Sequence, residues 1–381
     1  MGGECGEEEG VMKKVGIITL HRSANYGSVL QAYALQEKIK SLGYKVKIID
    51  YWPIRYTVLS MLKGLKNKTE LLRKNFLARA MARTVLLPSY LMRFRVFKMF
   101  VKKYLDLTDY QYTKEEDLEQ KQPIFDIYCT GSDQVWNSEW NGGVDKPMFL
   151  SFAPDNAKKI AYAASFGKDG LAKEEIEETR DLLQRYAAIS VRELDGVNIM
   201  DALGIKGSQC VLDPTLLLDG SKWREIASNK FEKEKYILVY NLNRNKTIHD
   251  YAEKLSRKTG YEIKYITYQL HDFYKKGKMY CNVSVEDYLG LIANAKYVVT
   301  DSFHGVAFSI NFNRDFMVFL PGKYNSRLKS LLQITELERR IVEDDGVELL
   351  DDKIEYKRVN EIITNERQKS ESILCQMLEE K

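Results

Sequence analysis

The stretch VGIITLHRSANYGSVLQAYALQEKI, residues 15–39, sets the pattern for the whole chain. Its first six residues form an apolar run that predicts a buried strand, and from Ser28 apolar residues recur at helical spacing toward Gly43. A polar and aromatic loop, residues 21–27, joins the two. A strand that leads through a short loop into a helix begins a βαβ unit, so this stretch predicts a parallel sheet.

The same alternation of strand and helix continues along the chain. Further strands are predicted over residues 45–51, 124–131, 159–167, 187–193, 208–215, 236–242, 261–267, 296–301 and 315–321. Helices are predicted over residues 28–42, 173–186, 195–203, 247–258, 284–294, 305–312 and beyond 358. A chain of 381 residues is too long for one typical core. We therefore predict an α/β protein of two Rossmann-like, doubly wound domains that face each other across a cleft.

We place the domain boundaries where this alternation breaks. Residues 1–14 are acidic and rich in glycine, and we expect them to be disordered. The N-terminal domain takes residues 15–215 and the C-terminal domain takes residues 216–355. Residues 356–381 follow as a charged helix with apolar periodicity.

Composition narrows the class of protein. Hydrophobic residues make up 44% and charged residues 29%, and the net charge is +4, well short of a nucleic-acid-binding arm. No uninterrupted apolar run is long enough to span a membrane. The acidic, glycine-rich residues 1–14 are not typical of a secretory signal, so we expect none. We expect a cytoplasmic protein with reduced thiols and no structural zinc, because five cysteines stand far apart: Cys5, Cys129, Cys210, Cys281 and Cys375.

Residues 55–105 form a basic insertion in the N-terminal domain. The segment has a helical pattern rich in Leu, Met and Phe, and it carries thirteen Lys or Arg residues against the single acid Glu70. A basic amphipathic segment can lie on an anionic membrane surface, at the inner face of the membrane. The alternative is a helical insertion whose charged face is solvated.

Ligands of doubly wound sheets bind outside the carboxyl ends of the strands, so we take the residues there as the candidate site. The chain has neither GxGxxG nor GxxxxGK[ST], which gives no support to a dinucleotide fingerprint or a P-loop. Backbone N–H groups at a helix start suit an anion or a hydroxyl instead. The candidate residues are polar, aromatic or basic: Ser23, Asn25, Tyr26, Gly27, Ser132, Asp133, Trp136, Arg192, Ser302, Phe303, His304, Lys323 and Arg327.

Three of these positions have a structural alternative. His304, in the motif DSFHG, is a candidate general acid or base. A helix start would lower the pKa of this imidazole, and a bound anion would raise it. The alternative is a structural histidine. Arg192 could clamp a carboxylate or phosphate, or form a salt bridge with Glu193 or Asp195. The opening loop could hold an anion, or could be a helix cap with Ser28 as the capping residue.

Six motifs occur here in a fixed order: NYGSVLQAYALQ, GSDQVWN, YAASFG, SVRE, VLDPTLLL and TDSFHG. Together they resemble the polysaccharide pyruvyl transferase family, over residues of about 15 to 330. The resemblance implies a fold like that of GT-B glycosyltransferases, in which the C-terminal helix packs back on the first domain. It also implies a reaction in which pyruvate from phosphoenolpyruvate becomes a ketal on two sugar hydroxyls and phosphate is released.

The resemblance also implies roles for single residues. His304 matches the family's histidine and would be the general acid, and Arg192 would clamp the phosphate or carboxylate of the donor. Some members have arginine where this chain has Ser302, so Lys323 or Arg327 would replace that contact, or the donor differs. The other implied contacts are Ser23, Asn25, Tyr26, Gly27, Ser132, Asp133, Trp136 and Phe303. No metal or cofactor is implied.

Two other functions remain open at this point. A GT-B glycosyltransferase that uses a nucleotide sugar would need an acid near the ribose, for which Asp301 is a candidate. A glycan-binding relative without catalysis would bind sugar without turnover. The expected partners are phosphoenolpyruvate and a saccharide acceptor, with a lipid-linked acceptor suggested by the basic segment, and no nucleic acid.

Overall fold

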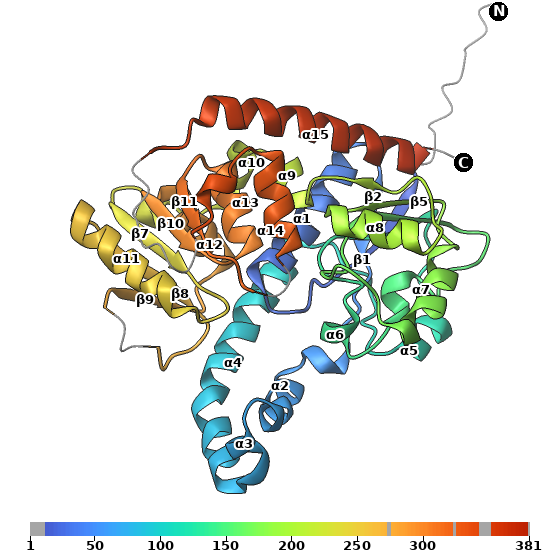
Figure 1. Cartoon of the computed structure of the whole chain (residues 1–381). Helices are drawn as coiled ribbons and strands as arrows, with labels where there is room; N and C mark the ends of the chain where they lie inside the picture. Colours follow the sequence, from blue (N-terminus) through green and yellow to red (C-terminus); the bar gives the residue numbers. More distant parts are fainter. Residues whose placement is uncertain (1–11, 273–275, 323–324, 343–351, 380–381) are drawn as a thin grey trace, which may run out of the picture.

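Two parallel β-sheets form the body of the molecule (Figure 1). The computed structural model describes residues 12–272, 276–322, 325–342 and 352–379. The first sheet has the order β2-β1-β3-β4-β5-β6 and consists of β1 (Lys14–Ile18), β2 (Lys45–Ile48), β3 (Ile127–Thr130), β4 (Lys158–Ala164), β5 (Ala188–Val191) and β6 (Gln209–Cys210). The second has the order β11-β10-β7-β8-β9 and consists of β7 (Tyr236–Tyr240), β8 (Glu262–Thr267), β9 (Lys278–Cys281), β10 (Tyr297–Thr300) and β11 (Asp315–Val318). The predicted α/β fold with two Rossmann-like units is confirmed.

Helices connect the strands of both sheets and also form two additions to them. The first half contains α1 (Tyr26–Ser41), α2 (Val58–Gly64), α3 (Glu70–Lys74), α4 (Phe76–Tyr104), α5 (Glu115–Gln120), α6 (Ser138–Asn141), α7 (Ile176–Leu183), α8 (Leu194–Ala202) and α9 (Pro214–Leu217). The second half contains α10 (Gly220–Ile226), α11 (Lys246–Thr259), α12 (Val285–Asn294), α13 (Phe303–Asn311), α14 (Ser326–Ile334) and α15 (Tyr356–Glu379).

Several elements differ from the sequence prediction, among them β6, β9 and α14. The strand predicted over 208–215 is only the two-residue β6, because Pro214 lacks a backbone N–H for the ladder and instead begins α9 behind the cap Asp213. The strand β9 was not predicted from its short sequence KMYC, which is only partly buried. The helix α14 follows a glycine turn and was also not predicted, so Arg327 lies in a helix rather than in a turn.

The strand order creates one crevice in each sheet. The order reverses between β1 and β3 in the first sheet and between β7 and β10 in the second. At such a reversal, the loops after the two neighbouring strands run to opposite faces of the sheet. They therefore diverge at the carboxyl ends of the strands and leave room for a ligand. Two loops flank the first crevice: the loop that joins β1 to α1, residues 19–25, and the loop 131–137. The second crevice is flanked by the loop 241–245 and by the start of α13.

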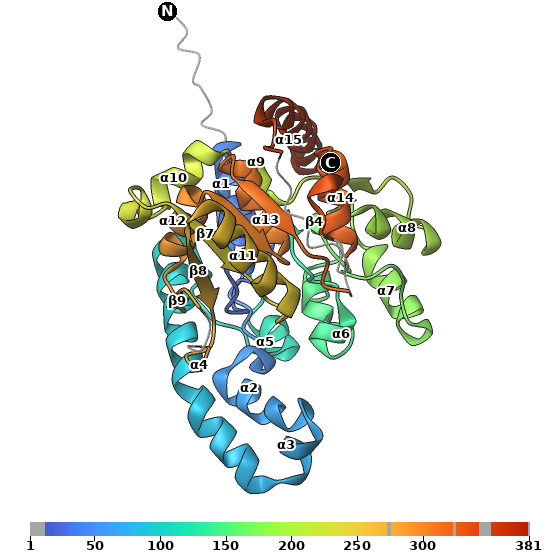
Figure 2. The same ribbon diagram turned by 60° about the vertical axis from the view of Figure 1, so that its left-hand side comes forward.

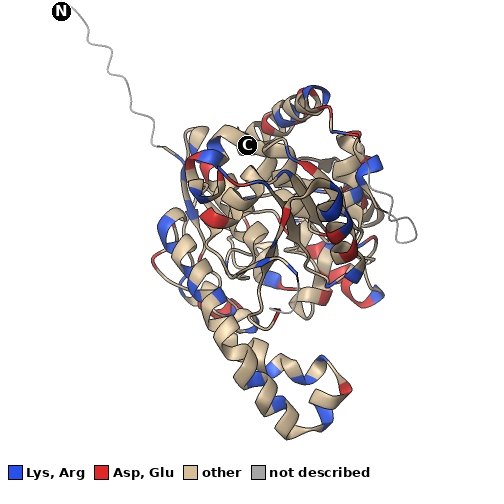
Figure 3. Ribbon diagram, turned by 90° about the vertical axis from the view of Figure 1, so that its left-hand side faces the viewer, with Lys and Arg blue, Asp and Glu red and all other residues tan. Residues whose placement is uncertain are grey.

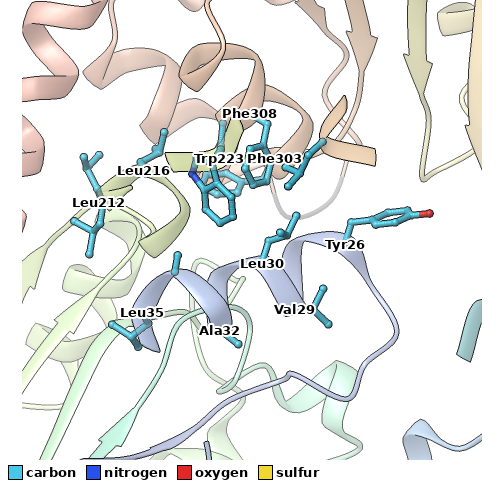
Figure 4. Close-up of a cluster of buried hydrophobic side chains, with 14 of the residues drawn as sticks. Tyr26, Val29, Leu30, Ala32, Leu35, Leu212, Leu216, Trp223, Phe303 and Phe308 are labelled. Atoms are coloured by element: carbon cyan, nitrogen blue, oxygen red, sulfur yellow. The ribbon is translucent and has the colours of Figure 1, made fainter. Parts of the chain in front are cut away.

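Helix α1 belongs to the first sheet but packs deeply against the second half of the chain (Figure 4). Its side chains face Trp223 of α10 and Phe303 and Phe308 of α13 across an apolar interface. One continuous buried cluster includes Ile17 of β1 and Leu238 of β7. The two sheets therefore share one hydrophobic core.

Helix α15 lies across both halves of the molecule (Figures 1 and 2). Just before it begins, the Ile354 backbone N–H donates to the Asp315 carboxylate of β11 at 2.9 Å. Toward its end, the Ser370 hydroxyl accepts from the Leu212 N–H at 3.0 Å and the Leu378 carbonyl accepts from Lys158 Nζ at 3.1 Å. The C-terminal helix thus links the edge of the second sheet to the first.

Helices α2, α3 and α4 project from the body as an arm, residues 58–104 (Figures 1 and 2). The last part of α4 is anchored in the core through Phe97, Phe100 and Val101. The first part of α4 packs against α2, α3 and the turn between them, residues 65–67. Among the described residues, no helix combines the length and the apolar character that a membrane span requires. Most of the predicted N-terminal tail, residues 1–11, lies outside the described residues.

Candidate active site

Helix α1 starts in the first crevice, behind a tight turn. Asn25 caps it, since its side-chain oxygen accepts from the Gly27 N–H at 2.9 Å. Ala24, just before the cap, has a φ of 51°, a value in the left-handed region. Ser28 is not the cap that the sequence suggested. Its hydroxyl instead donates to the carboxylate of Asp133, from the loop after β3.

Helix α13 starts in the second crevice, and its first turn lies against the first turn of α1. The Ser302 hydroxyl caps α13 by accepting from the Gly305 N–H at 3.3 Å. His304, one residue into the helix, lies directly against Gly27: a Cβ on Gly27 would be 1.9 Å from His304 Nδ1. Only glycine leaves room for the imidazole here. The N-termini of two helices, one from each half of the chain, therefore converge on one histidine.

Arg192 lies beneath this junction, at the end of β5. Its Nη1 donates to the Asp213 carboxylate at 2.7 Å, and its Nη2 lies 3.5 Å from the Asp133 carboxylate. The guanidinium also covers the ring of Phe303 at 4.8 Å. Glu193 is a more distant partner, with 3.9 Å between its Oε2 and Arg192 Nε. The salt bridge foreseen for Arg192 exists, but Asp213 is its main partner.

The buried carboxylates stay ionised beside these cations. Burial favours the neutral form of Asp213, but Arg192 and His304 outweigh it and lower its pKa to about 2. The pKa of Asp133 is lowered in the same way, against its burial, mainly by Arg192. Burial also acts to lower the pKa of Arg192, but the carboxylates of Asp213, Asp133 and Glu193 prevail and raise it. Arg192 is therefore a fixed positive charge.

His304 is in the opposite situation, because burial dominates. The residue is only 7% exposed, and burial lowers its pKa to about 4, helped by Arg192 and opposed by Asp213 and Asp133. Its Nε2 lies 3.9 Å from Asp213 Oδ1, too far for a hydrogen bond, and this buried nitrogen has no hydrogen-bond partner in the described part of the chain. In this state the imidazole is neutral at pH 7.

Arg327 at the start of α14 completes the group. Burial and the charge of Arg192 lower the pKa of Arg327 to about 10, which places the two guanidinium groups within electrostatic reach of each other. The Gln134 side-chain amide lies 2.9 Å from Arg327 Nη2 when its oxygen is turned toward the guanidinium. Within the described residues, the buried Nε atoms of Arg192 and Arg327 have no hydrogen-bond partner. Lys323, the other predicted cation, lies outside the described residues.

The structure does not bring all predicted residues to this junction. Tyr26 is fully buried: its ring stacks on Tyr288 at 4.2 Å between centroids, and its hydroxyl donates to the Val283 carbonyl at 2.8 Å. Trp136 is also buried, stacked on Phe149 at 5.3 Å. Aromatic neighbours pack against the rings of Tyr26 and Trp136, so neither ring offers a free face for a sugar.

The polar residues predicted from the two loops have mixed positions. The Ser132 hydroxyl donates to Asp213 at 3.0 Å, so it supports the carboxylate that holds Arg192. The buried Ser23 hydroxyl has no hydrogen-bond partner among the described residues. Asp133 has a φ of 76°, an uncommon value for a residue with a side chain, and such strain is concentrated at functional sites.

Sequence reasoning missed three members of the group: Asp213, Gln134 and the role of Ser28. Asp213 lies close to the predicted domain boundary and was not taken as a site residue, although an acid between two apolar runs in VLDPTLLL is a signal of a buried, paired carboxylate. Gln134 and Ser28 carry no signal beyond their place in the quoted motifs. Among the described residues, no group of three His, Cys, Asp or Glu side chains could hold a metal ion.

One family of known proteins matches most of the chain. The family model of polysaccharide pyruvyl transferases matches residues 25–322. The chain belongs to this family. The match covers most of the chain and includes every member of the junction except those in α14. A comparison of this pyruvyl transferase family member with curated proteins gives no match.

Several solved structures resemble this member of the pyruvyl transferase family at low identity. The UDP-GlcNAc 2-epimerase of Neisseria meningitidis bound to UDP-GlcNAc is 11% identical, with a TM-score of 0.47 over 96% of this chain and 99% of that one. The UDP-GlcNAc 2-epimerase of Methanocaldococcus jannaschii is 13% identical, with a TM-score of 0.47 over the same shares. The Escherichia coli heptosyltransferase WaaC with ADP is 11% identical, with a TM-score of 0.39 over 93% and 99%.

Proposed function

We propose that this transferase moves the pyruvyl group of phosphoenolpyruvate onto two hydroxyls of a saccharide, as a ketal, and releases phosphate. One observation carries the proposal: three buried nitrogens near the meeting point of two helix N-termini have no hydrogen-bond partner in the described part of the chain. They are His304 Nε2, Arg192 Nε and Arg327 Nε. Cations and helix N-termini both favour the binding of anions. A neutral imidazole beside them can act as a general acid once it is protonated. A small, highly anionic donor fits such a site.

Arg192 and Arg327 are the donor contacts in this proposal. Phosphoenolpyruvate has a phosphate and a carboxylate, and each of them suits a guanidinium. Ser302 stands where some family members have arginine, and here its hydroxyl is used to cap α13. The positive charge of Arg327 lowers the pKa of His304, which favours Arg327 as the replacement.

His304 acts as the general acid. A donor with several negative charges opposes the burial that keeps the imidazole neutral, so its binding raises the pKa of His304 and loads the proton. The proton passes to the methylene carbon of the donor, and a sugar hydroxyl adds to the adjacent carbon. The carbon–oxygen bond to phosphate then breaks, and a second hydroxyl completes the ketal. Of the two hydroxyl protons, one restores His304 and the other leaves with phosphate.

The acceptor is a saccharide of a surface polysaccharide or its precursor, handled in the cytoplasm. This part of the proposal rests on the family, whose substrates are saccharides by its description. A lipid-linked acceptor would bring the protein to the inner face of the membrane. The basic segment 55–105 supports that location.

A nucleotide-sugar glycosyltransferase is less well supported. That function needs an acid available to a ribose, and Asp301 was its candidate. The Asp301 carboxylate accepts from the backbone N–H groups of Leu242 at 2.7 Å and Asn243 at 2.8 Å. Both of its oxygens are therefore engaged in holding the loop after β7.

The test is phosphate release from phosphoenolpyruvate with a panel of acceptor glycans. We expect release that depends on one class of acceptor and falls by roughly 10²–10⁴-fold in His304→Gln, the range for loss of a general acid. His271→Gln, which changes a histidine outside the junction, serves as the matched control and should stay near wild type.

Two results would oppose the proposal. Acceptor-dependent release that is unchanged in His304→Gln would remove His304 as the acid. No release with any acceptor, together with a higher melting temperature in the presence of a nucleotide sugar, would favour the glycosyltransferase, because a ligand that binds only the folded state stabilises it.

A further inference from the structure

The arm, residues 58–104, has a large apolar surface that neither the core nor the candidate site uses. Leu77 is 75% exposed and Met81 is 71% exposed, values that are unusual for large apolar side chains of a soluble body. The other exposed apolar side chains of the arm are Leu59, Leu71, Phe76, Val85, Leu87, Leu91, Met92 and Met99. Ten of the eighteen large apolar side chains that are exposed on the described molecule therefore lie in the arm.

Five of these side chains form a stripe along α4. At 100° per residue, Leu77, Met81, Val85, Met92 and Met99 fall within an arc of about 80° on the helix. In the anchored half of α4, the opposite side supplies Phe97, Phe100 and Val101 to the core. The helix thus has a buried side toward the protein and a second apolar side toward solvent.

The arm is also strongly basic (Figure 3). Its exposed Lys and Arg side chains include Lys63, Lys66, Lys68, Arg73, Lys74, Arg95, Lys98, Lys102 and Lys103. Glu70, its single acid, is neutralised by Lys74 at 2.6 Å. Only Lys103 of this group reaches an acid of the body, Glu286 at 3.2 Å, among the ion pairs of the described residues.

We propose that the arm docks the protein on the surface of an anionic lipid bilayer. An apolar stripe flanked by cations suits the boundary between headgroups and acyl chains, where apolar burial and electrostatic attraction add. A second copy of the chain is a poorer occupant, because stripe-on-stripe pairing would bring two sets of cations together. This inference does not depend on the proposed reaction.

Side-chain contacts join the arm to the turn before the candidate site. Arg93 of α4 donates from Nε to the Ala24 carbonyl at 2.7 Å, in the turn before α1, and its guanidinium covers the Tyr268 ring at 3.9 Å. Nearby, the Ser89 carbonyl accepts from Asn282 Nδ2 at 3.1 Å. A docked arm would therefore hold the junction of the two halves beside the bilayer.

The test is flotation of the full chain with vesicles of phosphatidylcholine alone or mixed with phosphatidylglycerol, at low and high salt. We expect binding to the anionic vesicles only, weakened by salt. Reversing Lys63, Lys66 and Lys68 to Glu should lower the partition coefficient on the order of 100-fold. Replacing Leu77, Met81 and Val85 with Gln, which keeps the charge, should lower it at least roughly 10-fold.

A matched variant controls for net charge. Lys233→Glu, Lys235→Glu and Lys353→Glu change exposed lysines of the body by the same amount, and this variant should bind vesicles like wild type. All sites are on the surface, and circular dichroism checks that each variant is folded. Equal loss of binding in the arm and body variants would overturn the proposal, as would wild type that fails to float. A dimer that the Gln variant abolishes, without vesicle binding, would assign the stripe to a second copy.

Discussion

At His304, burial and charge act on one imidazole in opposite directions. Two carboxylates, Asp213 and Asp133, raise its pKa, yet burial lowers it to about 4 from an ordinary value of 6.5. Burial outweighs the two carboxylates, and the positive charges of Arg192 and Arg327 act in the same direction as burial. An anion bound beside His304 would add negative charge and raise the pKa, so the protonation of His304 depends on what the site binds.

The lowered pKa of His304 has a consequence for stability against pH. Between pH 6.5 and 4 the unfolded chain binds a proton that the folded protein refuses, so the free energy of unfolding falls as the pH is lowered through this window. At pH 5 we expect a loss of about 2 kcal/mol relative to pH 7 from this group. His304→Asn, which does not titrate, should lack this loss in urea unfolding at the two pH values. An equal pH dependence in both proteins would show that the pKa is not lowered.

Single residues of the site were partly predictable. His304 and Arg192 were correctly placed at the ends of strands because the strand-end rule is local: a polar residue after an apolar run lies at the edge of a parallel sheet. Asp213 was not, since its role depends on a contact with Arg192, which is 21 residues away in the chain. Tyr26 was misjudged because its surroundings come from the second sheet, which periodicity around residue 26 cannot reveal.

At the scale of elements, the decisive contact is that of α1 with α13. Gly27→Ala should push the imidazole aside, because the new Cβ would lie 1.9 Å from His304 Nδ1. We expect kcat/KM to fall on the order of 100-fold from this misplacement, and the free energy of unfolding to fall by about 1–3 kcal/mol from overpacking. Phosphate release and urea unfolding measure the two.

A matched glycine controls for the backbone effect of Gly27→Ala. Gly64 lies at the end of α2, and a Cβ added to it would meet no atom within 4 Å, so Gly64→Ala should leave activity unchanged. If Gly27→Ala were as active as Gly64→Ala, the position of His304 would not matter to the reaction.

Elements with strong periodicity were predicted well, and weak ones were not. Strand β1 and helices α11 and α12 have clear apolar patterns and were placed within a few residues. Strand β9 has four residues at the edge of its sheet, and only its pairing with β8 gives it a strand conformation. Such pairing is a tertiary effect that overrides local preference.

At the scale of the whole molecule, the two sheets should unfold together. They share one buried cluster that includes Ile17 and Leu238, and α15 contacts both halves. In urea we expect one transition, with tryptophan fluorescence and far-ultraviolet circular dichroism coincident. Trp136 reports on the first sheet and Trp223 on the shared cluster. Two separate transitions would show that the shared cluster does not couple the halves.

The convergence of two helix N-termini with two guanidinium groups also bears on how turnover ends. Until a ligand enters, Asp133 and Asp213 serve as internal counter-ions, and they give up part of that task when an anion arrives. In the proposed reaction, the cations that attract the phosphate group of the donor also attract the phosphate that is released. We therefore expect release of phosphate to be a slow stage of the proposed cycle.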